Sequence, residues 1–97
     1  MRKVYVSEQV WDIIFELEQY LKEELKFSKE AARKRSDRMR EFLKSLSAPA
    51  DYALCRFKRW RAMGYRCAVF EKWIFAYETF DGGVIVQDMA YGATLIE

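Results

Sequence analysis

The stretch that decides the fold reads GYRCAVF at residues 64–70, WIFAYETF at residues 73–80 and VIVQDMAYG at residues 84–92. These runs are rich in aromatic and β-branched residues, and short polar breaks separate them, a pattern typical of a three-stranded antiparallel meander. Asp81-Gly82-Gly83 is the stronger turn signal, because glycine accepts the positive φ of tight hairpins. Glu71-Lys72 has the length of a two-residue hairpin loop.

Strand alternation predicts which of these residues share a face of the sheet. A two-residue loop at Glu71-Lys72 places Arg66 opposite Tyr77 and groups one face, which consists of Arg66, Ala68, Phe70, Trp73, Phe75 and Tyr77. If Gly82-Gly83 is the second loop, Tyr77 lies opposite Asp88, whereas a slip of one residue moves Asp88 to the other side. Both faces are apolar, so alternation leaves open which one meets the helices.

The residues before this stretch predict a short strand and two helices. Lys3 to Val6 alternates as a strand does, and Ser7 is a good N-cap for a helix over Glu8 to about Leu25. Ser28 can cap a second helix that ends near Leu46, before Pro49. The link is short, so the helices should form an antiparallel hairpin. Further on, residues 54–57 are a candidate strand and residues 58–61 a basic loop around Trp60.

These elements predict a single α+β domain over residues 1–97. Its short N-terminal strand and helical hairpin would pack on a three- to four-stranded, mainly antiparallel sheet whose other face stays open. No apolar run approaches the ~20 residues of a membrane span, and no secretory signal is apparent at the N-terminus. We therefore expect a cytoplasmic protein with no membrane partner.

Charge and cysteine content narrow the function classes. The formal net charge is only +2, but residues 52–70 hold all of their charge as bases: Arg56, Lys58, Arg59, Arg61 and Arg66. Such a segment suits an anionic partner. The chain has no histidine, and Cys55 and Cys67 lack metal-type spacing, so we expect neither a metal nor a cofactor. The cysteines are expected to be small buried hydrophobes in a reducing compartment.

The order of these features resembles the RelE/ParE superfamily of bacterial toxins. The resemblance covers nearly the whole chain and depends on four segments: residues 4–7 (VYVS), 64–66 (GYR), 74–78 (IFAYE) and 91–93 (YGA). The family supplies the toxin of type II toxin–antitoxin modules, whose members are often described as plasmid stabilisation proteins. RelE-type members cleave messenger RNA on the ribosome, and ParE-type members inhibit DNA gyrase.

The resemblance also assigns candidate residues. Arg66 matches the strand arginine that RelE-type ribonucleases place at the scissile phosphate, and Tyr91 stands where many members have a histidine, so these two would be catalytic in a nuclease. Contacts to a nucleic acid or another target would come from the bases Lys58, Arg59, Arg61 and Arg66. An often basic position on the last strand is Asp88. With no histidine, the protons would have to be moved by a tyrosine, a carboxylate or a lysine, and the candidates are Tyr91, Tyr77, Glu78, Asp88 or a lysine. In a non-functional alternative, Arg66 pairs with Asp88 and Tyr91 packs at the strand end.

The expected function is therefore a ParE-like toxin that binds a target such as DNA gyrase. The alternatives are a RelE-like, ribosome-dependent mRNA endoribonuclease, or a degenerate non-toxic homologue that binds nucleic acid. The class implies a cognate antitoxin, whose segment would wrap the helices or extend the sheet, and assembly as a homodimer or a toxin–antitoxin hetero-oligomer. Trp11, Phe15 and Trp60 are the candidates for an exposed apolar groove that receives it.

Overall fold

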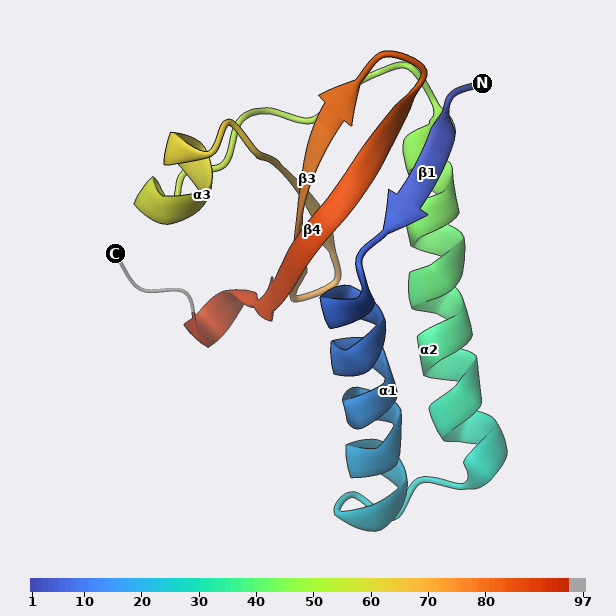
Figure 1. Cartoon of the computed structure of the whole chain (residues 1–97). Coiled ribbons are helices and arrows are strands. Elements are labelled where there is room, and N and C mark those ends of the chain that lie inside the picture. The colour runs from blue at the N-terminus through green and yellow to red at the C-terminus, as the bar shows by residue number, and fades with distance from the viewer. Residues whose placement is uncertain (95–97) are drawn as a thin grey trace.

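The structure, a computed structural model, describes residues 1–94 and has the predicted α+β architecture (Figure 1). The elements in chain order are β1 (Lys3–Val6), α1 (Glu8–Glu23), α2 (Lys29–Lys44), η1 (Ser45–Ser47), α3 (Lys58–Ala62), β2 (Arg66–Phe70), β3 (Trp73–Phe80), β4 (Gly83–Tyr91) and η2 (Gly92–Thr94). Within the described residues, no helix has the length and apolarity that a membrane crossing requires.

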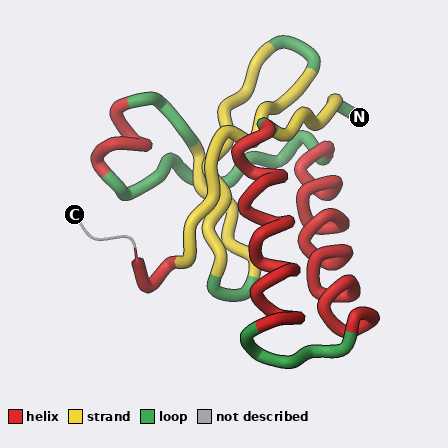
Figure 2. The backbone as a smooth tube through the Cα atoms, turned by 60° about the horizontal axis from the view of Figure 1, so that its bottom comes forward, coloured by secondary structure: helices red, strands yellow, loops and turns green. Residues whose placement is uncertain are grey.

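The strands form one four-stranded sheet in the order β1-β4-β3-β2. The pairs β2–β3 and β3–β4 are antiparallel, and β1 joins the free side of β4 in parallel. The predicted mainly antiparallel sheet with an N-terminal strand is confirmed. The α1–α2 hairpin packs on one face of this sheet, whereas α3 lies on the other side (Figures 1 and 2).

Serine caps start both long helices as the sequence predicts. The Ser7 hydroxyl accepts from the backbone N–H of Val10 at 3.3 Å, and the Ser28 hydroxyl accepts from that of Ala31 at 3.1 Å. Each α-helix ends two residues earlier than expected. In the link, Lys26 has a left-handed φ of 57°, and after α2 the chain tightens into the 3-10 turn η1.

The main core lies between the hairpin and the face of the sheet that carries Ala68, Phe75 and Tyr77. On this side α1 and α2 contribute Val10, Ile14, Met39 and Leu43, all buried, and Phe70 and Trp73 pack at its edge. The predicted grouping of residues on β2 and β3 is confirmed. The sequence left open which face of the sheet meets the helices, and the structure shows that it is the face that carries Ala68, Phe75 and Tyr77.

The first hairpin has the predicted register, and the second does not. Phe70 lies opposite Trp73, and Arg66 opposite Tyr77. The second loop, however, is Asp81-Gly82 rather than Gly82-Gly83, since Phe80 pairs with Gly83 and Gly82 holds the positive φ of 85°.

A bulge then changes the pairing further along β3 and β4. Tyr77 pairs with Val86, but its neighbour Ala76 pairs with Asp88, so one extra residue lies on β4. The bulge keeps Val86 and Met89 on the core side and directs Asp88 to the opposite face. The register with Tyr77 opposite Asp88, which depended on a Gly82-Gly83 loop, is therefore not formed, and Asp88 lies on the other side, as the alternative register allowed.

Residues 54–62 also differ from the expectation. Only Leu54 makes an isolated bridge, to Arg66, so there is no strand at residues 54–57. The basic segment is not an irregular loop but contains the short helix α3. Since this segment folds over the second face of the sheet, that face is partly covered rather than open.

Candidate functional site: a basic loop closed by a disulfide

The most distinctive feature outside the main core is the basic loop, which we define as residues 55–67. It leaves the edge of the sheet beside β2 and returns into β2 itself. At its base the Cys55 N–H donates to the Tyr65 carbonyl at 2.9 Å, and the Cys67 N–H donates to the Ala53 carbonyl at 3.2 Å. Gly64, with a φ of 77°, makes the return turn after α3.

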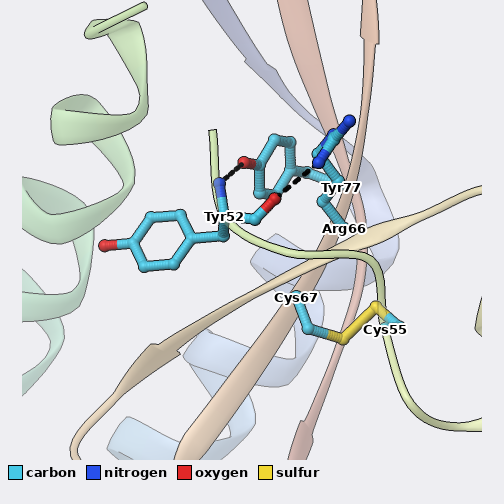
Figure 3. The surroundings of a disulfide bond; sticks show 5 residues. All are labelled: Tyr52, Cys55, Arg66, Cys67 and Tyr77. Atoms are coloured by element: carbon cyan, nitrogen blue, oxygen red, sulfur yellow. Dashed lines mark hydrogen bonds between the residues drawn. A yellow bond between two sulfur atoms is a disulfide. The ribbon is translucent and has the colours of Figure 1, made fainter. Parts of the chain in front are cut away.

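A disulfide between Cys55 and Cys67 closes this loop (Figure 3). The two Cα atoms lie 4.8 Å apart, and the residues are separated by 12 positions in sequence. The expectation of two unbonded, buried thiols is therefore wrong. The chain segment before the loop runs back along β2, and this places the two cysteines side by side; nothing in their spacing alone indicated it.

Trp60 anchors the loop to the sheet. Its side chain is only 3% exposed and packs with Cys55 and Ala76 in a small second core, bordered by Phe57, whose ring lies 5.8 Å from that of Trp60. Trp60 is therefore not the exposed aromatic of an apolar groove that the sequence predicts; the small part of it that reaches the surface lines a polar cleft beside Arg59. Its burial instead fixes the orientation of α3.

The other predicted binding residues of the loop face solvent. Lys58, Arg59 and Arg61 on α3 are exposed, and none of the three forms an ion pair with any residue from 1 to 94. Next to Arg59, a polar cleft of about 370 Å³ opens toward β4; its lining includes Gln9, Tyr65, Gln87 and Asp88. The structure thus gathers three cations that are not paired with any acid of residues 1–94.

Arg66 is placed differently from the other bases. Its Nη1 donates to the Tyr52 carbonyl at 2.7 Å (Figure 3). The suggested pair with Asp88 is absent, because the Asp88 carboxylate lies on the other face and accepts from Gln9 Nε2 at 3.0 Å. Arg66 therefore fastens the segment that leads into the basic loop.

Tyr77 is the centre of the same fastening and was not singled out as such by the sequence. Its buried hydroxyl accepts from the Tyr52 N–H at 2.9 Å and donates to Asp51 Oδ1 at 3.3 Å. Arg2 Nη2 lies 2.6 Å from the same carboxylate oxygen. The hydrogen bond from Arg2 holds the pKa of Asp51 below its usual value, and burial raises the pKa of Tyr77.

The two residues proposed for RNA cleavage do not come together. Tyr91 pairs with Trp73, its ring 5.4 Å away from the indole, whereas Arg66 pairs with Tyr77. Trp73 and Tyr77 are four residues apart on β3, and β3 separates the other two strands. At the usual rise and spacing of strands, the Cα atoms of Arg66 and Tyr91 are about 16 Å apart, and each side chain contacts another residue, Tyr52 in the case of Arg66 and Trp73 in the case of Tyr91.

A second surface lies on the hairpin side. Trp11 is 39% and Phe15 60% exposed, so both stand where the sequence predicts exposed aromatics. Beside Trp11, a groove of about 230 Å³ runs between the helices and β1, and its lining residues are Val4, Val6, Trp11, Arg40, Leu43 and Lys44. It combines an apolar floor with two cations.

Comparison with known proteins adds no assignment: no family model matches the chain, and no curated protein is similar to it. No three metal-type ligands gather at one point in residues 1–94. The chemistry available at the basic loop is therefore that of fixed, exposed cations.

Proposed function

We propose that the chain is a ParE-like toxin of a bacterial type II toxin–antitoxin module, which acts in the cytoplasm by binding a target such as DNA gyrase. One observation supports binding over RNA cleavage: Arg66 on β2 and Tyr91 on β4 are separated by β3 and pair with it four residues apart, at Tyr77 and Trp73. A ribonuclease needs its cation and its proton carriers around one phosphate. The fold that the resemblance implies agrees with the observed one at the level of element order.

The basic loop is the surface that we assign to the target. Lys58, Arg59 and Arg61 are held by a buried tryptophan and a disulfide rather than on a mobile tail. A fixed array loses less conformational entropy on binding, and its charge speeds encounter with an acidic surface. This arrangement suits recognition of an anionic patch on a protein.

The test has three readouts: growth and message integrity after induced expression, and gyrase supercoiling with the purified protein. We expect growth arrest, inhibition of gyrase supercoiling by the purified protein, and intact messages in primer extension. Arg66→Ala should leave messages unchanged, because there is no cleavage to lose. Messages cleaved by the wild type and not by Arg66→Ala would establish the nuclease instead, and absence of arrest would favour the degenerate homologue.

The proposal includes a cognate antitoxin bound in the groove beside Trp11. Alternate backbone groups of β1 bond to β4, so those of Val4 and Val6 point to the free edge, where an extended segment can pair. Arg40 and Lys44 at the rim favour an acidic residue in that segment.

Co-expression with the product of the neighbouring gene tests this part. We expect the two proteins to co-purify, and we expect Trp11→Ala combined with Phe15→Ala to weaken the complex by tenfold or more, since exposed aromatics dominate such interfaces (about 1–2 kcal/mol). Tyr20→Ala, an exposed aromatic farther along α1, is the matched control. Equal yields of complex from the double variant, the Tyr20→Ala control and the wild type would exclude this groove.

A further inference from the structure

The Cys55–Cys67 bond lies at the one point where the basic loop joins the sheet. All five bases of residues 52–70 lie between the two cysteines, and no acid does. The loop therefore repels itself, and a covalent bond at its base opposes that repulsion.

Besides the disulfide, the loop is held by a small second core, against which Phe57 and Tyr65 pack, and by a few backbone bonds. Helix α3 has five residues, too few to be stable alone. The second core has three buried members, one of which is Cys55 itself, together with Trp60 and Ala76. The backbone bonds at the base are those of Cys55 with Tyr65 and of Cys67 with Ala53. Removal of the disulfide thus weakens both the closure and the packing of the loop.

The rest of the domain does not depend on the loop. The buried residues of the main core come from α1, α2, η1 and β2 to β4, and none lies in residues 55–66. The segment before the loop is also held from the sheet, because the Tyr52 N–H donates to the Tyr77 hydroxyl on β3 and Arg66, the first residue of β2, donates to the Tyr52 carbonyl (Figure 3). Opening of the loop is therefore a local event of low cost compared with unfolding.

We propose that Cys55 and Cys67 form a redox switch that controls presentation of the basic loop. As a disulfide, the pair holds α3 against the sheet and fixes Lys58, Arg59 and Arg61 for binding. As two thiols, the pair releases the loop and the affinity for the target falls. Under this scheme an oxidant activates binding, and a dithiol reductant reverses it. The target meant here is the anionic partner assigned under the proposed function, so the effect of the switch on binding rests on that proposal.

The chemistry balances with a peroxide as the oxidant. One thiolate attacks the peroxide, becomes a sulfenic acid and releases hydroxide; the second thiol displaces the sulfenic oxygen as water and forms the S–S bond. Reduction follows by exchange. A reductant thiolate attacks Cys67, the less buried of the pair, and Cys55 leaves as a thiolate. The second reductant thiol then frees Cys67, and the reductant leaves as a disulfide.

Limited trypsin digestion of the intact protein tests the switch without a target, because the loop carries its own cleavage sites. We expect cleavage within residues 56–66 to be about tenfold or more faster with dithiothreitol than after peroxide. Lys34 and Arg35 on α2 are internal references, whose cleavage should not change. Cys55→Ala combined with Cys67→Ala should match the reduced protein under both conditions, with circular dichroism as a check of folding.

Gyrase supercoiling, measured on the same samples, separates the two proposals. Stronger inhibition by the oxidised protein supports the switch at its target. If the loop opens on reduction but neither form inhibits gyrase, the proposed function is contradicted, whereas the redox switch is still supported. Equal cleavage of the oxidised and reduced wild-type loop would overturn the switch.

Discussion

At the scale of single residues, Tyr77 connects the main core to the segment that leads into the basic loop. Its ring lies in the main core, and its hydroxyl reaches the segment that leads to the basic loop. A buried tyrosine hydroxyl usually finds a partner, and here Tyr52 and Asp51 both serve. The position of the basic loop therefore depends on a polar contact made from within the core.

Tyr77→Phe should lower the free energy of unfolding by about 1–2 kcal/mol, because the partly buried Tyr52 N–H loses its acceptor. Urea denaturation measures this. Tyr20→Phe, on the exposed side of α1, is the control and should change stability by less than about 0.5 kcal/mol. A Tyr77→Phe protein as stable as the wild type would show that water replaces the hydroxyl without cost.

Asp51 adds a pH dependence with a defined sign. Arg2 lowers the pKa of this carboxyl in the folded state, so its contribution is present above the ordinary value near 3.9 and is lost as pH falls through the lowered pKa. Asp51→Asn should cost about 1 kcal/mol at pH 7, and the difference from wild type should shrink toward pH 2. Asp12→Asn on α1 is the control. A deficit that stays constant between pH 7 and pH 2 would contradict the ion-pair explanation.

At the scale of elements, the helices and the first hairpin could be predicted, because local signals determine them. Ser7 and Ser28 cap the helices, and Glu71-Lys72 closes the hairpin. The bulge on β4 could not be predicted, since an alternating run looks the same on either side of an extra residue. Helix α3 and the disulfide could not be predicted either, because both depend on tertiary contacts: burial of Trp60 orients the helix, and the pairing of residues 53–55 with β2 brings the cysteines together.

Gly83 is the position where the β3–β4 hairpin is least tolerant. A Cβ atom there would lie 2.8 Å from the Lys3 carbonyl oxygen of β1 and 2.8 Å from Phe80 Cζ. The phenyl ring can turn away, but the backbone oxygen cannot. Gly83→Ala should therefore destabilise the protein by about 1–3 kcal/mol in thermal or urea unfolding.

Gly92→Ala is a milder comparison, because its nearest contact would be 3.3 Å, to the Lys72 carbonyl oxygen. We expect it to cost less than Gly83→Ala. The reverse order would mean that β1 can shift at Gly83, against the parallel pairing of Lys3 with Gly83 that the sheet shows.

At the scale of the whole molecule, the sheet separates two surfaces with different roles. The α1–α2 hairpin covers one face and leaves exposed aromatics beside β1, whereas the basic loop covers part of the other face (Figure 1). The sequence placed the bases in one segment but could not show that they form a closed, anchored loop. It also could not show that Arg66 and Tyr91 lie far apart, because that depends on strand pairing.

The most direct test of target binding through the basic loop is a gyrase supercoiling assay with matched charge variants. Lys58→Ala/Arg59→Ala/Arg61→Ala should raise the inhibitory concentration about tenfold, since three contacts of about 0.5 kcal/mol are lost. Lys22→Ala/Lys29→Ala/Lys34→Ala removes equal charge from the hairpin and should change it by less than about twofold. Equal inhibition by both triple variants and the wild type would contradict the proposed role of the loop.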